Sequence, residues 1–299
     1  MGARAPGLRR EAGGVSAPGR GPGPVAGSPP DGQGLLRPPR GGALYSGNAR
    51  AVFARGMRAQ WRANWAVMAS GFVEPVLYLL AMGVGLGSIV GEVTGPDGAP
   101  VAYAAYIAPA LLAVSAMNGA VYDSTWNVFF KLRYSRLYEG MLNTSLGPLD
   151  VALGEIGVAL VRGGVYAAGF TAVMAAMGLV HSWWAVLMVP GAVLVAFGFA
   201  AFGMAVTSFM RTFQQMDWVT FLTLPLFLFS GTFYPLEVYP EPVRWAVQAL
   251  PLWHGVELLR DLAAGAPGAA TAGHAAYYLA LVGVGVLVTT ARLRALFLR

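Results

Sequence analysis

The chain has 299 residues, of which 56% are hydrophobic and only 11% are charged, and its formal net charge is +6. Soluble globular domains contain about 25% charged residues, so the composition excludes an ordinary soluble domain. The absence of cysteine excludes a disulfide, a thiolate nucleophile and a thiolate metal site.

Residues 1–43 are rich in Gly, Pro and Arg and contain few large apolar side chains. Such a segment cannot bury enough apolar surface to offset its chain entropy, which predicts a disordered cytoplasmic tail. It also lacks the apolar core of a signal peptide. One interpretation is a basic tail that touches anionic lipid. The other, which we favour, is a dispensable extension or a start codon chosen too far upstream.

Six apolar runs are each long enough to cross a hydrocarbon core about 30 Å thick. The runs are continuously apolar and do not alternate, which favours helices over a β-barrel. Residues 44–299 are therefore predicted to form one all-α transmembrane domain. The predicted spans are 65–88, 103–122, 151–179, 183–207, 217–234 and 273–291.

The positions of the basic residues predict the orientation of these spans. They are concentrated before the first span and after the second, fourth and sixth, whereas the first outer loop, 91–100, has two acids and no base. Because cytoplasmic loops carry the excess of Lys and Arg, both termini are expected in the cytoplasm. The excess of Ala, Gly and Arg indicates a GC-rich coding sequence, so we expect the bacterial cytoplasmic membrane. The basic residues on the expected inner side are Arg50, Arg55, Arg58, Arg62, Lys131, Arg133, Arg136, Arg211, Arg292, Arg294 and Arg299.

Residues 47–64 precede the first span and show helical periodicity. Phe53, Met57, Trp61 and Trp65 recur every four residues, with arginines on another side. This pattern predicts an amphipathic helix at the membrane interface.

Residues 123–150 form the longest predicted cytoplasmic loop. Five apolar side chains in it follow helical spacing and form one stripe, which predicts a short amphipathic helix that ends before Gly147-Pro148. The helix could dock into a groove of a partner, or lie flat under its own bundle. The stripe consists of Phe130, Tyr134, Leu137, Tyr138 and Met141, and the polar side chains around it are Lys131, Arg133, Arg136 and Glu139.

Two charged residues lie deep inside predicted spans, Glu74 in the first and Arg162 in the third. Both lie at a similar distance from the cytoplasmic end of their helices. An unpaired charge in the membrane is costly, so we expect the two to be in contact or to share a polar cavity. The alternative is that each side chain reaches the cytoplasmic interface independently.

The stretch 235–270 is neither a full span nor a polar loop. Prolines interrupt it at 235, 240, 242 and 251, which excludes a continuous helix but leaves room for two short helices, at 242–249 and 252–263. Trp245 is typical of interfacial depth. The segment could re-enter the membrane, where it must be buried in protein or line a cavity, or lie on the outer surface.

Motifs for energy coupling are absent from the sequence. Lys131 is the only lysine and no glycine precedes it, so the chain has no Walker A loop. A Ser230–His254 protease dyad is conceivable, but FSGTF lacks the first glycine of a GxSG motif. An ion-coupled secondary transporter is the stronger alternative, although such proteins have broken helices in both halves and only one broken region is visible here.

Several segments together resemble the type-2 permeases of ATP-binding-cassette exporters, in the nodulation-J and daunorubicin-resistance-like branch. They are EPVLYLLAMGVGLG (74–87), YIAPALLAVSAMNGAVYDSTW (106–126), RLYEGMLNTSLGPLDVALGE (136–155), Arg162, FSGTFYPLEVYP (229–240) and LPLWHGVELLRDL (250–262).

The resemblance, which covers about residues 45–295, implies six spans, an N-terminal interfacial helix, a cytoplasmic coupling helix and two short re-entrant helices before the last span. It implies that residues 129–143 contact a separate ATPase subunit, which binds ATP and Mg²⁺, so that this chain binds no cofactor and catalyses no reaction. A homodimer of permeases within the bilayer is expected, and no nucleic-acid partner. The implied substrates are lipid-linked saccharides, glycolipids or hydrophobic drugs. The implied coupling residues are Lys131, Arg133, Tyr134, Arg136, Tyr138, Glu139 and Met141, and the implied outer gate contains Pro235, Pro240, Pro242, Trp245, Pro251 and His254.

Two features depart from the family pattern. The Thr-Pro-Leu expected after the coupling helix is Thr144-Ser145-Leu146 here, and the long N-terminal segment is not part of the pattern.

Overall fold

A computed structural model of the chain describes residues 45–62, 73–95, 98–180 and 182–297. The chain divides into two compact units, Met1–Gly34 and Leu35–Arg299, and every described residue belongs to the second. The predictions for the tail 1–43, for Trp65 and for the first part of span 65–88 lie outside the described residues.

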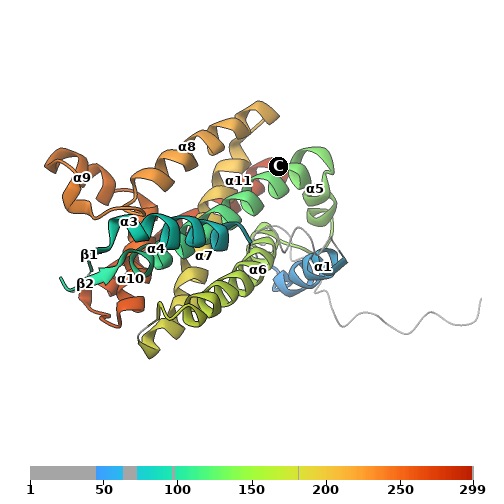
Figure 1. The fold of residues 1–299 in the computed structure, drawn as a ribbon. Helices are drawn as coiled ribbons and strands as arrows, with labels where there is room; N and C mark the ends of the chain where they lie inside the picture. Colours follow the sequence, from blue (N-terminus) through green and yellow to red (C-terminus); the bar gives the residue numbers. More distant parts are fainter. Residues whose placement is uncertain (1–44, 63–72, 96–97, 181, 298–299) are drawn as a thin grey trace, which may run out of the picture. The chain divides into compact units, whose positions relative to one another are not determined.

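Five helices in the described part of the chain are long and apolar enough to cross a membrane (Figure 1). They cover Val73–Val90, Tyr103–Tyr134, Pro148–Ala176, Trp183–Phe209 and Ala269–Phe297. Within them lie α3 (Gly87–Val90), α4 (Tyr103–Tyr122), α6 (Pro148–Ala176), α7 (Met188–Phe209) and α11 (Ala269–Phe297). Three stretches are wound as π-helix, namely Leu79–Leu86, Asp123–Asn127 and Phe130–Tyr134, and Trp183–Leu187 is a 3₁₀-helix. The prediction of a helical membrane protein is confirmed at this level.

The predicted span 217–234 contains a helix that is shorter than a span. This helix, α8 (Met216–Phe229), has 14 residues and follows a 3₁₀ turn at Phe213–Gln215. At 1.5 Å per residue it is about 21 Å long, less than the hydrocarbon core of about 30 Å. The chain turns just after it at Gly231, whose φ of +70° is a conformation that favours glycine.

The second long helix continues well beyond the predicted end at residue 122. It runs to Tyr134 and has 32 residues, a length of about 48 Å, so its last turns extend past a hydrocarbon core. The helix then breaks at Arg136, which has a left-handed φ of 45°, and the short helix α5 (Leu137–Leu142) begins after it. Residues 129–143 therefore do not form one amphipathic helix, and the predicted apolar stripe is divided between two helices.

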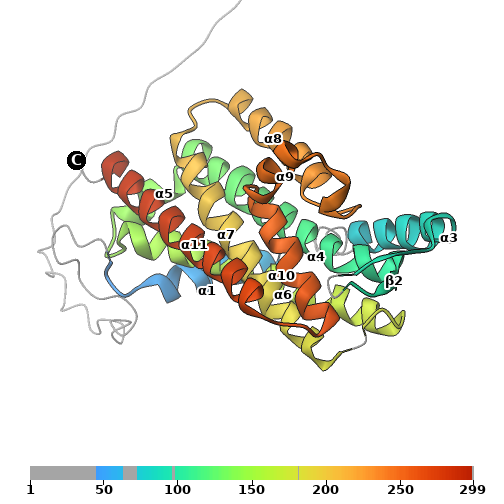
Figure 2. The ribbon, with the colours of Figure 1, turned by 90° about the vertical axis from the view of Figure 1, so that its left-hand side faces the viewer.

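The core is built around α7, which packs against α4, α6, α11 and a shorter helix, α10 (Pro251–Ala264). Figure 2 shows α11 running alongside α7. Small residues allow this close approach: a Cβ atom added to Gly285 would lie 2.6 Å from the backbone of Ala201. Close packing at glycine is a common basis of helix association in membranes, where the hydrophobic effect between helices is weak.

The helix predicted within 47–64 is α1 (Ala49–Arg62), and it lies beside α6 in both views (Figures 1 and 2). Val52 is buried there against Gly154 of α6. The buried carboxylate of Asp150 joins the two helices, because it accepts hydrogen bonds from the backbone N–H groups of Ser46, Asn48 and Gly147 at 2.8–2.9 Å. Asp150 thereby serves both the start of α6 and the residues that precede α1.

Short elements join the long helices at the other end. The strands β1 (Glu92–Thr94) and β2 (Pro100–Ala102) form an antiparallel pair in which Val93 lies opposite Val101. After α8, a 3₁₀ turn at Leu236–Val238 leads to α9 (Glu241–Gln248) and then to α10. The two short helices predicted at 242–249 and 252–263 are confirmed, with ends shifted by one residue. Proline has no N–H to donate and is therefore tolerated in a first helical turn, which is where Pro242 and Pro251 lie.

Candidate functional site

A cavity of about 680 Å³ lies between the helix Val73–Val90, α4, α6 and α8. Its volume is in the range of pockets that hold drug-sized molecules. The wall is largely apolar and aromatic, and hydroxyl and amide groups are interspersed in it. The aromatic lining residues are Tyr78, Tyr122, Trp126, Tyr166 and Phe227. The uncharged polar lining residues are Ser115, Asn118, Thr220 and Thr223.

Glu74 and Arg162, the two intramembrane charges singled out from the sequence, both line this cavity. They do not form the direct contact that was the first alternative. Arg162 instead pairs with Asp123, whose other carboxylate oxygen accepts a hydrogen bond from the Asn127 side chain at 2.7 Å. Among the described residues Glu74 forms no ion pair. The arrangement is thus a shared cavity in which Arg162 is neutralised by a third residue.

The sequence interpretation missed Asp123 because it ended the second span at residue 122. Asp123 begins a π-helical turn inside the continuous helix and is 7% exposed. A usable signal was present, since Asp123 and Asn127 have the i, i+4 spacing of partners on a continuing helix. π-helical turns in long helices are often found at functional sites.

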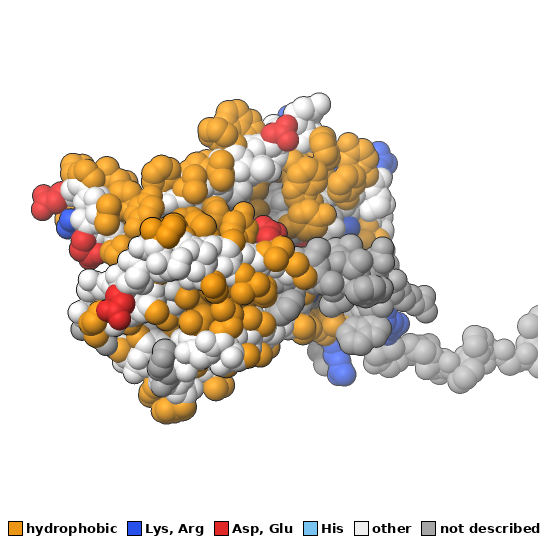
Figure 3. Space-filling model, in the orientation of Figure 1, with side chains coloured by type: hydrophobic (Ala, Val, Ile, Leu, Met, Phe, Trp, Pro, Cys, Tyr) orange, Lys and Arg blue, Asp and Glu red, His pale blue; other side chains and the backbone are white. Residues whose placement is uncertain are grey.

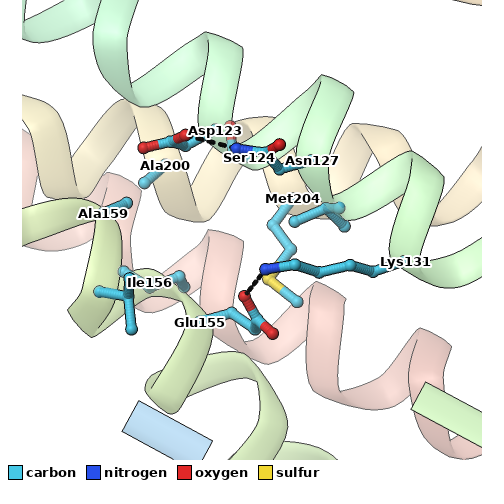
Figure 4. A pocket seen from close by; sticks show the side chains of 11 residues that line it. Asp123, Ser124, Asn127, Lys131, Glu155, Ile156, Ala159, Ala200 and Met204 are labelled. Atoms are coloured by element: carbon cyan, nitrogen blue, oxygen red, sulfur yellow. Dashed lines mark hydrogen bonds and ion pairs between the residues drawn. The ribbon is translucent and has the colours of Figure 1, made fainter. Parts of the chain in front are cut away.

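A second ion pair joins the same two helices. Lys131 Nζ lies 2.5 Å from Glu155 Oε2, and Figure 4 shows the two side chains pointing toward each other at a small pocket. Lys131 is therefore directed into the bundle and is not polar decoration on a partner-facing helix. On each helix the acid precedes the base by about two turns, so an antiparallel pairing places each acid opposite a base. A shift of either helix by one turn would break both pairs.

The residues predicted to contact an ATPase divide into exposed and buried groups. Tyr134, Arg136 and Glu139 are exposed at the junction between the long helix and α5. Tyr138 is completely buried and Met141 is 7% exposed, because both pack into the chain's own core. Burial also raises the pKa of the Tyr138 hydroxyl well above its ordinary value. The expectation that Tyr138 and Met141 form partner contacts is corrected accordingly.

Arg133 is occupied within the chain as well. Its Nε and Nη2 atoms donate hydrogen bonds to the backbone carbonyl of Met210, at 3.1 and 2.7 Å. This contact ties the end of the second long helix to the segment after α7. Arg133 therefore acts here as a link between neighbouring segments.

The segment after α8 is held by Arg260, which is 4% exposed. Its Nη2 atom donates to the backbone carbonyl of Gly231 at 2.6 Å, and its guanidinium carbon lies 3.9 Å from the centre of the Tyr106 ring. Arg260 thus fixes the turn after α8 to α4 and α10. Of the predicted gate residues, Pro235 and Pro240 immediately precede helical turns, whereas Trp245 on α9 is 74% exposed.

His254 on α10 forms a ring pair with His274 on α11, in which their Nδ1 atoms are 2.8 Å apart. One nitrogen must donate and the other accept, so the pair is not doubly protonated. The His254 ring also stacks on Tyr277 at a centroid distance of 4.0 Å. Burial lowers the pKa of His254 to about 4, and the neighbouring His274 acts in the same direction. The Ser230 hydroxyl, considered above as its partner, is buried with no hydrogen bond among the described residues.

Large apolar side chains are exposed along α8 and the helix Val73–Val90. Figure 3 shows hydrophobic side chains gathered over α8 on the visible face. Exposed apolar surface of this extent marks contact with lipid or with another protein. The exposed residues on α8 are Trp218, Phe221, Leu222, Leu224, Leu228 and Phe229, and those on the other helix include Leu77, Leu80, Val84 and Ile89.

Comparison with known proteins connects this architecture to one family. The profile of the family described as "ABC-2 type transporter" matches residues 48–263. Nodulation protein J of Rhizobium leguminosarum bv. viciae is 31% identical over 254 residues, which are 84% of this chain and 96% of that protein. Nodulation protein J of Rhizobium leguminosarum bv. trifolii is 31% identical over 262 residues, covering 87% and 96%. The protein of the same name from Sinorhizobium fredii is 32% identical over 226 residues, covering 75% and 84%. The predicted resemblance is confirmed: the chain belongs to the ABC-2 type transporter family, as a membrane subunit of an ABC transporter.

Proposed function

We propose that the chain is the permease subunit of an ATP-driven exporter that moves an amphipathic molecule outward from the cytoplasm or the inner leaflet. The observation that carries this proposal is the cavity of about 680 Å³ among the long helices of an ABC-2 family member. Its apolar and aromatic wall suits a lipid tail or a drug ring, and its hydroxyl and amide groups suit a polar head. Lipid-linked saccharides, glycolipids and hydrophobic drugs are the substrate classes that combine these two parts.

In this proposal both termini lie in the cytoplasm of a bacterial cell. The basic residues gather in the segments on the same side as the termini, and cytoplasmic segments carry the excess of Lys and Arg. The helix α8 is then a sixth membrane segment, and α1 lies at the inner interface. The helices α9 and α10 re-enter the outer leaflet and cap the outer end of the path. The network of Arg260, which is buried although charged, supports a fixed position for this cap.

A separate ATPase subunit supplies the energy in this proposal. ATP and Mg²⁺ bind to that subunit, and this chain binds no cofactor. The contact surface consists of Tyr134, Arg136 and Glu139, which are exposed where the long helix Tyr103–Tyr134 ends and α5 begins. Movement of this surface is transmitted to the cavity by the same helix, since Tyr122 and Trp126 line the cavity wall.

The working unit in this proposal is a homodimer. The exposed apolar side chains of α8 and of the helix Val73–Val90 lie on the two helices that bound the cavity together with α4 and α6. A second copy at this surface would cover these side chains and close the open side of the cavity.

Reconstitution with an ABC ATPase subunit, sought first among the reading frames next to this gene, tests the function. The permease is expected to co-purify with that ATPase, and amphiphile export into liposomes should require ATP. Glu139→Arg should lower transport several-fold while the melting temperature stays unchanged, with exposed Asn143→Ala as the matched control on the same surface. Uptake driven by an ion gradient without the ATPase would contradict the proposal and favour an ion-coupled secondary transporter.

A further inference from the structure

We propose that the cavity selects organic cations, so that the amphiphile carried by this permease has a positively charged head that binds Glu74 and the aromatic wall. This inference rests on the proposed exporter function and narrows its substrate class. It follows from which charges in the cavity are already neutralised and from the chemistry of the surrounding rings.

The first step concerns the charges of the cavity. Glu74 and Arg162 are the two charged side chains among the described residues that line it. Arg162 is paired with Asp123, which lies behind the wall and is itself buried. Glu74 is exposed and has no ion pair in the described part of the chain. The charge left without a partner is therefore one negative charge.

The second step concerns the aromatic wall. Tyr78 and Phe227 meet edge to face at a centroid distance of 6.1 Å, and Tyr122 stacks on Trp126 at 6.5 Å. Tyr78 and Tyr122 both line the cavity and are 42% and 53% exposed, so neither ring is fully covered by the chain. Aromatic faces attract cations, and rings arranged around a site are a known way to bind quaternary ammonium groups. Tyr78 lies one helical turn from Glu74, so the carboxylate and a ring belong to the same part of the wall.

The third step excludes the opposite preference. An anionic head would have to compete with the Asp123 carboxylate for Arg162, and weakening that ion pair would leave the buried carboxylate less well compensated. It would also be repelled by Glu74. Both effects act against an anion and neither acts against a cation.

A pair of hydrophobic ions of equal shape and opposite charge tests the inference directly. Tetraphenylphosphonium and tetraphenylborate binding is measured on the purified permease in nanodiscs, with empty nanodiscs to subtract partition into lipid. The wild-type protein is expected to bind the cation at least about tenfold more tightly than the anion, the effect of one unit charge at close range. Equal binding, or tighter binding of the anion, would overturn the inference.

A series of variants at residue 74 assigns the preference to this position. Glu74→Asp keeps the charge and should keep the preference. Glu74→Gln should abolish it, and Glu74→Lys should reverse it, while the Asp123–Arg162 pair stays intact in all three. A preference that is unchanged in Glu74→Gln would show that Glu74 does not set it.

This experiment separates the inference from the proposed function, because binding in nanodiscs requires neither the ATPase nor transport. ATP-dependent export of a neutral amphiphile without a cation preference would overturn only the inference. A cation preference in a protein that exports nothing with its ATPase would contradict only the proposed function.

Discussion

The helices Val73–Val90 and Tyr103–Tyr134 are both apolar enough to cross a membrane, yet they have different surroundings. In the apolar 18-residue stretch of the first helix, 17% of the residues are buried within the chain, and in that of the second helix 61% are buried. The second helix carries Asp123 and Lys131, which pair with α6, whereas the first exposes leucine and valine along its length. Hydropathy thus identifies both membrane helices, but the paired charges of the second show that it has protein neighbours within the chain.

The strongest test of this difference is the Asp123–Arg162 pair. Arg162→Ala leaves the Asp123 carboxylate buried without a partner and should destabilise the protein by about 3 kcal/mol, measured by thermal unfolding in detergent. Exposed Arg211→Ala is the control and should stay within about 0.5 kcal/mol. Adding Asp123→Asn to Arg162→Ala should recover part of the loss. Equal losses in the Arg162 and Arg211 variants would show that the pair does not hold these helices together.

A smaller effect is expected from equivalent truncations in the two helices. Leu112 of α4 is 2% exposed, and Leu112→Ala should cost about 2 kcal/mol because it creates a cavity. Leu80 is 46% exposed, and Leu80→Ala should change the stability of the monomer by less than about 0.5 kcal/mol. A large loss for Leu80→Ala in a dimeric sample, together with a weaker dimer, would instead locate the second copy on this helix.

A still smaller difference in stability is expected between alanine substitutions at two glycines of α11. The Cβ atom of Gly285→Ala would lie 2.6 Å from the Ala201 backbone, whereas that of Gly283→Ala would meet no atom within 4 Å. We expect Gly285→Ala to destabilise by about 1–2 kcal/mol, since α7 and α11 must move apart. Gly283→Ala should be neutral or slightly stabilising, because alanine favours the helix. If the two variants unfold at the same temperature, the close contact between α7 and α11 is not formed.

The smallest effect concerns pH and His254 of α10. The pKa of His254 falls from 6.5 to about 4 on folding, so between these values the unfolded chain binds a proton that the folded chain does not. Stability should therefore fall as the pH drops from about 6.5 to 4. Because the ring is partly exposed, we expect a discounted effect of about 1 kcal/mol, or about 2–4 °C in melting temperature. His254→Gln should remove this part of the slope; an unchanged slope would show that His254 does not cause it.

Local signals were sufficient to predict much of this fold. Pro242 and Pro251 predicted the two short helices, because the effect of proline on helix geometry is confined to its own neighbourhood. Gly147-Pro148 likewise marked the boundary before the third span, although α6 begins at Pro148 and the predicted span began at residue 151. Long apolar runs predicted the spanning helices, since length and apolarity are properties of one segment alone.

The errors arose where distant residues decide the outcome. Arg136 takes a left-handed conformation that its residue type does not favour, so the helical spacing of the stripe gave no warning of the break. The partner of Arg162 lies 39 positions away on another helix, and charge and depth alone pointed to Glu74. The burial of Tyr138 also depends on packing against other helices, which the spacing within one segment does not reveal.

The carboxylate of Asp150 has a consequence for how force travels through the molecule. Three backbone N–H groups converge on it, and two of them belong to residues just before α1. Separating α1 from α6 would remove hydrogen-bond donors from the buried Asp150 carboxylate, which is costly, so we expect α1 and the first turn of α6 to move together. The side-chain amide of Asn48 also donates a hydrogen bond to the carbonyl of Ser145, three residues after α5 ends. A force on α5 is therefore expected to reach the residues before α1 through this hydrogen bond.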